Sequence, residues 1–255
     1  MANILILGGT TDARRIAERL AERPGLNVRL SLAGSTAAPA ALPVPVRIGG
    51  FGGAERLAVY LKAEGVDVLI DATHPYARKM SANAAWAAQT VGVPLIALQR
   101  PPWAQVEGDR WIEVDSVGEA VEALGASPRR VFLALGRKDI APFAEAPQHH
   151  YVVRSVDPID PPLAVPSADY IRARGPFSEE NDRALLNKYR IDVVVSKNSG
   201  GSATYGKIAA ARALALPVVM LRRPPSQPDV PVVETADEVI ALLDHTLAPD
   251  AARGV

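Results

Sequence analysis

Short apolar runs alternate with longer amphipathic segments along the first half of the chain. Runs rich in Val, Ile and Leu predict β-strands at residues 3–8, 27–32, 44–48, 67–71 and 94–99. Apolar residues recur with helical spacing in three segments between these runs, at 11–23, 54–64 and 76–91. Continuous apolar strands alternating with helices are typical of a parallel sheet that is covered on both faces.

The second half shows the same alternation with a longer interruption. Apolar runs predict strands near 130–135, 150–154, 191–196 and 217–222. Helical spacing predicts helices near 179–189, 206–215 and 236–244. Residues 155–166 contain four prolines and little periodicity, which indicates a loop. A stiff connector is slightly favoured over a lid for this loop, and the sequence leaves both open.

Several segments of the first half recur in the second half in the same order. The paired segments are Ile4–Gly8 with Phe132–Gly136, Asp67–Ile70 with Asp192–Val195, and Pro94–Pro102 with Pro217–Pro225. Each half then ends in a capping box that predicts a helix start, at Ser116–Glu119 and at Thr235–Glu238. We therefore predict an α/β protein with two Rossmann-like domains, 1–115 and 116–255, related by a weak internal repeat. The repeat does not show whether the last strand of each half stays in its own sheet.

Composition limits the classes of function. The 255 residues suffice for two domains, and 48% of them are apolar, which is enough for a core in each. The 28 basic and 28 acidic residues balance, so the overall charge favours neither nucleic acid nor a membrane surface. Cysteine is absent and the four histidines lack metal-ligand spacing, so no metal site is expected. The start lacks the pattern of a signal peptide and no apolar run would span a membrane, so we expect a cytoplasmic protein.

The segment Ser196–Lys207 is the most informative in the chain. It follows an apolar run and precedes an alanine-rich helical segment, so it reads as the loop between a strand and a helix. Its glycines, hydroxyls and lysines, together with the helix start, predict an anion-binding loop. Gly201–Lys207 has the spacing of an ATP-binding loop, but residue 208 is Ile where that motif needs Ser or Thr. A solvated turn is the remaining alternative.

Glycines and hydroxyl groups follow the first strands of the chain. A turn of two glycines after the first strand suits a dinucleotide, although its spacing is not G-x-G-x-x-G. The second strand ends without the acidic residue that an NAD site uses, so NADPH is favoured over NADH. Arg29 and Arg47 are candidate partners for a 2′-phosphate. The predicted coenzyme-binding residues are Gly8, Gly9, Thr10, Thr11, Ser31, Ser35, Thr36, Gly50, Gly52, Thr73 and His74.

Taken together, these loops resemble the precorrin-6A reductase family. In the first half the likeness lies in Ile6–Thr11, Gly49–Gly53, Asp71–Ala77 and Arg100–Trp103. In the second half it lies in Leu135–Arg137, Val153–Ser155, Arg174–Phe177 and Ser196–Gly201. The resemblance implies an NADPH-dependent oxidoreductase of cobalamin (vitamin B12) biosynthesis that reduces one double bond of precorrin-6A, giving precorrin-6B. It also implies two Rossmann-like domains that enclose the coenzyme and the substrate. From the residues themselves, the glycine turns of the first domain suit NADPH and most of the cationic loops that suit the tetrapyrrole lie in the second domain.

A precorrin carries many carboxylate arms, and lysine and arginine bind carboxylates through strong charge-assisted hydrogen bonds. The predicted substrate-binding residues are Arg14, Lys79, Arg137, Lys138, Arg154, Arg174, Lys197, Asn198, Ser199, Gly200, Gly201 and Lys207. The proton donor is not assigned: His74, Tyr76 and Lys197 are candidates, and an ordered water is the alternative. Transient contact with the next enzyme of the pathway is a partner interaction on which the sequence gives no information.

Two other functions compete with this interpretation. A reductase of the short-chain type would use a Tyr-x-x-x-Lys pair, and none of the six tyrosines has a lysine four positions later. A non-catalytic NADP(H) sensor would need neither turnover nor clustered cations in the second half. The loop composition favours the precorrin reductase over both.

Overall fold

The computed structural model describes residues 1–34, 41–225 and 230–248. The chain folds into two units. One consists of Met1–Pro101 with Pro224–Val255, and the other consists of Pro102–Arg223. Each unit has its own six-stranded sheet, in which all strand pairs are parallel.

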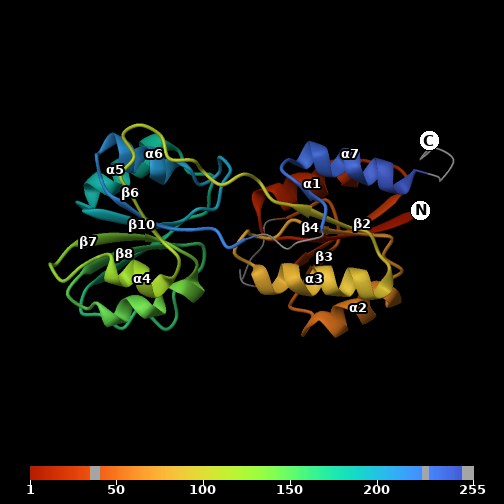
Figure 1. Ribbon diagram of the computed structural model, residues 1–255, viewed down its shortest axis with the longest axis horizontal. Coiled ribbons are helices and arrows are strands. Elements are labelled where there is room, and N and C mark those ends of the chain that lie inside the picture. The colour runs from red at the N-terminus through yellow and green to blue at the C-terminus, as the bar shows by residue number, and fades with distance from the viewer. Residues whose placement is uncertain (35–40, 226–229, 249–255) are drawn as a thin grey trace. The chain divides into compact units, whose positions relative to one another are not determined.

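The sheet of the first unit has the strand order β12-β5-β4-β1-β2-β3. Its strands are β1 (Ala2–Leu7), β2 (Leu26–Leu32), β3 (Val46–Ile48), β4 (Val68–Asp71), β5 (Leu95–Leu98) and β12 (Val232–Val233). Its helices are α1 (Thr11–Ala21), α2 (Ala54–Ala63), α3 (Arg78–Val91) and α7 (Ala236–Leu247). Helices α1 and α7 cover one face of this sheet, and α2 and α3 cover the other (Figure 1).

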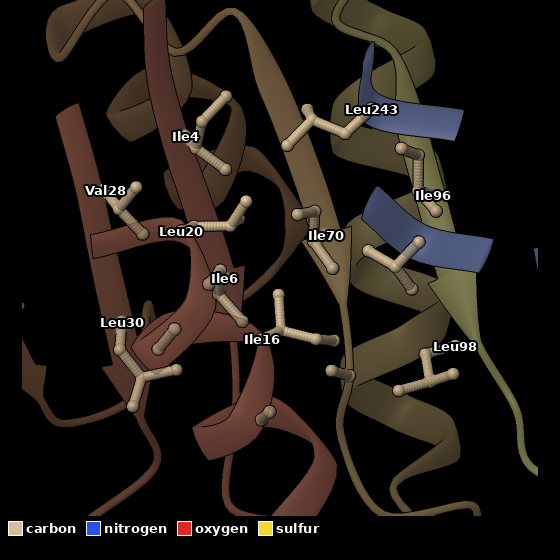
Figure 2. Close-up of a cluster of buried hydrophobic side chains, with 14 of the residues drawn as sticks. Ile4, Ile6, Ile16, Leu20, Val28, Leu30, Ile70, Ile96, Leu98 and Leu243 are labelled. Atoms are coloured by element: carbon tan, nitrogen blue, oxygen red, sulfur yellow. The ribbon is translucent and has the colours of Figure 1, made fainter. Parts of the chain in front are cut away.

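Burial on both faces explains why the central strand β1 is apolar at consecutive positions. Ile4 and Ile6 belong to the cluster under α1 and α7, which also contains Leu20 and Leu243 (Figure 2). Leu5 and Leu7, which alternate with them, belong to the cluster under α2 and α3. Because successive side chains of a strand point to opposite faces, a strand covered on both sides needs no polar position.

The sheet of the second unit has the order β6-β11-β10-β7-β8-β9. Its strands are β6 (Trp111–Val114), β7 (Arg130–Ala134), β8 (His150–Ser155), β9 (Ala168–Arg172), β10 (Val193–Lys197) and β11 (Val218–Leu221). Its helices are α4 (Val117–Glu122), α5 (Glu179–Lys188) and α6 (Gly206–Ala213), with 3₁₀ turns at Arg137–Asp139 and Ala141–Glu145. Helices α5 and α6 lie on one side of this sheet and α4 on the other (Figure 1).

The two halves exchange their last strands. Strand β12 follows the second repeat but pairs with β5 of the first unit, and β6 follows the first repeat but pairs with β11 of the second. Prolines at 101–102 and 224–225 end the fifth strand of each half, because proline has no N–H to continue a ladder. The units therefore differ from the expected ranges 1–115 and 116–255: residues 102–115 join the second unit, and 224–255 join the first.

The predicted α/β class with two Rossmann-like sheets is confirmed, and every strand predicted from an apolar run is present. Both capping boxes form, since the backbone N–H groups of Glu119 and Glu238 donate to the hydroxyls of Ser116 and Thr235. The sequence pattern missed β6, β9 and β12. All three lie at sheet edges and are two to five residues long, so they lack a continuous apolar run.

Candidate functional site

Each sheet has one point at which the strand order reverses. In the first unit the reversal lies between β1 and β4, and in the second it lies between β7 and β10. The loops that leave the two neighbouring strands diverge there, so open parallel sheets bind ligands at the carboxyl ends of this strand pair. The glycine turn follows β1 and the loop Ala72–Ala77 follows β4, while the turn with Arg137 follows β7 and the loop after Lys197 follows β10. The fold therefore places these four candidate loops at the two reversal points.

The two glycines after β1 have different roles. A side chain at Gly8 would place its Cβ 2.6 Å from Leu30 Cδ1, so Gly8 allows the close packing of turn and strand. Gly9 has a φ of +119°, and no atom lies within 4 Å of where its Cβ would be. The backbone at Gly9 is therefore open to a ligand, in a conformation that favours glycine.

Thr10 connects this turn to the loop after β4. Its Oγ1 accepts a hydrogen bond from Ala13 N at 3.0 Å, which caps α1, and donates one to Ala72 O at 2.8 Å. Thr11 follows as the exposed first residue of α1. The N-terminus of α1, which carries a partial positive charge, therefore lies at the reversal point.

A small pocket lies at the same edge. It is lined by Thr10, Asp12, Ala72, Thr73, Pro75, Leu98 and Arg100. Arg100 forms an ion pair with Asp12 in the first turn of α1, and both side chains are largely buried. The guanidinium offsets the negative charge of this carboxylate at the helix end. Our prediction from sequence omitted this pair, although Arg100 lies in one of the segments that carry the family resemblance.

The loop after β4 holds the remaining coenzyme candidates. The buried carboxylate of Asp71 accepts hydrogen bonds from Thr73 N at 3.0 Å and Thr73 Oγ1 at 2.7 Å. The rings of His74 and Tyr76 lie 5.6 Å apart, and Tyr76 N donates to His74 Nδ1 at 3.4 Å. This loop is thus fixed by its own contacts, with His74 and Tyr76 half-buried.

The ends of β2 and β3 carry the candidate 2′-phosphate partners. Ser31 is buried, and Arg47 is its partner in the strand register, with Nη1 3.5 Å from Ser31 Oγ. The Arg47 guanidinium lies 3.9 Å from the centre of the Phe51 ring. Arg29 instead donates to Tyr60 Oη at 2.8 Å and pairs with Glu64 at 2.6 Å. Of the two candidate arginines, only Arg47 lies beside the serine; the other two hydroxyl candidates, Ser35 and Thr36, lie outside the described residues.

The loop after β3 is open at one of its two candidate glycines. No atom lies within 4 Å of a Cβ placed on Gly50, whose carbonyl accepts a hydrogen bond from Arg47 Nη2 at 3.1 Å. Gly52, with a φ of +83°, has the side chain of Arg56 only 2.9 Å from its Cβ position.

In the second unit an ion pair joins the two loops at the reversal point. Lys197 Nζ, at the end of β10, lies 2.6 Å from Asp139 Oδ2 in the 3₁₀ turn that follows β7. Arg137 and Lys138 of that turn are exposed. The structure thus brings these three predicted cations to one edge.

Two other predicted cations are buried. Arg154 forms an ion pair with Asp182 of α5 and lies 3.7 Å from the Phe177 ring centre. Lys207 is 3% exposed, and its Nζ donates to Thr204 O at 2.7 Å. A buried charge is costly unless it is paired or hydrogen-bonded, and each of these two groups has such a partner inside the unit.

Three further candidate cations lie on other elements, whereas Asn198–Gly201 continue the loop after Lys197. Arg174 is exposed and follows β9. Arg14 is half-buried on α1 and Lys79 is exposed on α3, both in the first unit. Asn198 and Ser199 are buried beside Gly200 and Gly201, whose φ values are +67° and +71°.

Nowhere in 1–34, 41–225 or 230–248 do three or more His, Cys, Asp or Glu residues form a group that could hold a metal ion. Over the same residues, no helix has the length and hydropathy needed to cross a membrane.

Fold and candidate site together define a two-unit Rossmann-like protein with a glycine turn at the reversal point of one sheet and cations at that of the other. The profile of the family described as Precorrin-6x reductase CbiJ/CobK matches residues 3–244. The chain belongs to this family, which places it among the oxidoreductases of cobalamin biosynthesis.

Individual relatives agree with this assignment along the whole chain. A precorrin-6A reductase from a Sinorhizobium species is 57% identical over 247 residues, covering 96% of this chain and 94% of that protein. The precorrin-6A reductase of Rhodobacter capsulatus is 47% identical over 100% of both chains. A solved structure of CobK precorrin-6A reductase has a TM-score of 0.93 at 47% identity, covering 97% of this chain and 98% of that one.

The buried lysine makes stability depend on pH. Burial, and to a smaller extent Arg154, lowers the pKa of Lys207 from 10.5 to about 7. Between these two values the unfolded chain binds more protons, so the free energy of unfolding rises with pH. From pH 7 to pH 9 we expect wild type to gain about 2 kcal/mol relative to Lys207→Met. Urea unfolding at both pH values measures this gain. The exposed Lys188→Met is the control and should follow wild type; identical pH slopes for wild type and Lys207→Met would contradict the account.

Proposed function

We propose that this protein reduces precorrin-6A to precorrin-6B with NADPH as hydride donor. The main support for the proposal is that the two reversal points offer different chemical groups. The edge of the first unit offers open glycine backbone, a helix N-terminus and hydroxyls. The edge of the second unit offers three cations. A dinucleotide suits the first edge, and a ring bordered by carboxylates suits the second.

Three parts of the first unit have groups that would suit a bound dinucleotide. The open backbone of Gly9 and the free N–H groups at the start of α1 would bind the pyrophosphate, as at other helix N-termini. Gly50 offers a second stretch of open backbone. Thr73 and His74, on the loop after β4, would hold the nicotinamide end. When bound, the coenzyme supplies a hydride and leaves as NADP⁺.

Arg47 and Ser31 are the proposed determinants of NADPH over NADH. A 2′-phosphate is recognised by an arginine near the end of the second strand, where an acidic residue would instead bind the ribose hydroxyl of NAD. Arg47 lies over an aromatic ring and beside a serine hydroxyl, which holds its planar guanidinium in one orientation. Ser35 and Thr36 remain proposed contacts on sequence alone.

The second unit would bind the carboxylate arms of the macrocycle. Lys197 is held at the edge by Asp139, and the exposed Arg137 and Lys138 extend the positive charge on the adjoining turn. Arg174 is a further proposed contact from the loop after β9. Several charge-assisted hydrogen bonds at once would fix the ring in one orientation, which is the main requirement for transfer to a single carbon.

Reduction of the double bond also needs a proton on the carbon next to the one that receives the hydride. His74, Tyr76 and Lys197 remain the proposed donors, since each carries a transferable proton at one of the two edges. His74 and Tyr76 lie together on the coenzyme side, whereas Lys197 lies on the substrate side. The protein otherwise contributes by orienting the reactants and excluding water.

A turnover assay tests this function directly. The purified full chain is mixed with precorrin-6A and NADPH, and the nicotinamide absorbance and the macrocycle spectrum are followed together. We expect one NADPH to be oxidised for each precorrin-6A converted. NADPH binding without oxidation would favour the sensor and contradict the enzyme.

Coenzyme preference is tested by substituting Arg47. We expect Arg47→Ala to raise the KM for NADPH about 10- to 100-fold, which corresponds to the loss of one or two charged hydrogen bonds, while the KM for NADH stays nearly unchanged. Arg29→Ala is the matched control, because that arginine is engaged by Glu64 and should leave both KM values near wild type. Equal effects of Arg47→Ala on NADPH and NADH would show that Arg47 does not bind the 2′-phosphate.

A further inference from the structure

The loop that follows β10 is held by a residue of a distant segment. Trp103, just after the chain enters the second unit, exchanges two hydrogen bonds with the side chain of Asn198. Trp103 N donates to Asn198 Oδ1 at 2.7 Å, and Asn198 Nδ2 donates to Trp103 O at 2.9 Å. The Asn198 amide thus completes the hydrogen bonding of the Trp103 backbone as a neighbouring strand would.

The indole of Trp103 fixes the far end of the same loop. Its Nε1 donates to Gly201 O at 2.8 Å. Its ring lies 4.8 Å from Lys207 Nζ and 5.6 Å from the centre of the Tyr205 ring. The ring therefore packs against the Lys207 amine and the Tyr205 ring while its N–H points to the loop.

The segment on which the chain leaves the second unit contacts this loop as well. Arg223 Nη2 donates to Ser199 O at 3.0 Å, and Arg223 Nε donates to Asn198 O at 3.4 Å. Both crossover segments thus bind residues 198–201. Two of these four residues are glycines in the left-handed region, which have the greatest conformational freedom when unfolded. The contacts from outside the loop restrict this freedom.

We infer that Trp103 is a positioning residue, which holds the backbone of residues 198–201 in the conformation that binds the macrocycle. The inference rests on the proposed function for the identity of the ligand. The side chain of Asn198 is hydrogen-bonded to the Trp103 backbone, so it would contribute to substrate binding by stabilising this conformation and not by contacting the macrocycle. Arg223 supports the same backbone from the second crossover segment.

The indole hydrogen bond favours one conformation of residues 198–201 over the others, so its loss shifts this conformational equilibrium. Without the Trp103 N–H, the carbonyl of Gly201 loses a partner and the loop samples more conformations. The apparent substrate affinity is the intrinsic affinity multiplied by the fraction of molecules that keep the binding conformation, so it decreases as this fraction decreases. For one neutral hydrogen bond this corresponds to about a 3- to 10-fold rise in KM. The kcat should change little, because the bound complex has the same geometry.

The experiment compares Trp103→Phe with Trp111→Phe in the full-length protein. Trp111, also half-buried in the second unit, has a buried Nε1 without a hydrogen-bond partner among the described residues. The same substitution therefore removes a bonded N–H at 103 and an unbonded one at 111. For each variant, KM and kcat for precorrin-6A, the Kd for NADP⁺ and the hydrogen exchange of residues 198–201 are measured. Lys197→Ala, which removes a proposed contact, serves as the positive control for KM.

We expect Trp103→Phe to raise the KM for precorrin-6A and to speed hydrogen exchange at 198–201, with kcat and the Kd for NADP⁺ unchanged. Trp111→Phe should match wild type in all four quantities. Asn198→Ala should reproduce the Trp103→Phe pattern, since it breaks the same attachment.

Three results would overturn the inference, and they have different meanings. Unchanged exchange in Trp103→Phe would show that the indole does not hold the loop. Faster exchange with an unchanged KM would show that the loop does not bind the macrocycle, and an unchanged KM in Lys197→Ala would support the same conclusion. Equal rises in KM for Trp103→Phe and Trp111→Phe would indicate general destabilisation. Absence of turnover in wild type would instead contradict the proposed function itself.

Discussion

The parallel pairing of β1 with β4, and of β7 with β10, determines where the glycine turn and the cationic loop after β10 lie. In each pair the chain leaves neighbouring strands in opposite directions, so the two loops begin side by side and then diverge. The central residues of these strands are buried on both faces, which fixes the register, because a slip by one residue would exchange the side chains of the two faces. The Thr10–Ala72 hydrogen bond and the Lys197–Asp139 ion pair then join the loops of each pair.

The strand exchange gives the crossover segments a second role. The prolines of the first segment follow β5 and those of the second follow β11, and each segment then leads into the other unit. Each segment also contacts a proposed binding loop. Arg100 pairs with Asp12 beside the glycine turn, while Trp103 and Arg223 hold the loop after β10. These short stretches therefore lead to the exchanged edge strands, and their side chains also support the proposed binding loops.

The fold was largely predictable because its signals are local, whereas much of the site was not. Apolar runs and capping boxes identify the central strands and helix starts within a few residues of sequence. Burial of a charged side chain depends on a distant partner: Arg154 needs Asp182 of α5, and Arg100 needs Asp12 of α1. Trp103 and Asn198 are likewise far apart in the sequence, and no pattern in it predicts that they are in contact. Glycines and lysines at strand ends predicted the location of the edges, but not which cations are exposed.

The central claim is that the first unit seats the coenzyme and the second unit seats the macrocycle. A crystal structure of the full chain with NADP⁺ tests this claim most directly. The account predicts pyrophosphate density on the backbone of Gly9–Thr11 and a 2′-phosphate beside Arg47. Coenzyme density on the loop of residues 197–201, with the glycine turn after β1 empty, would contradict it.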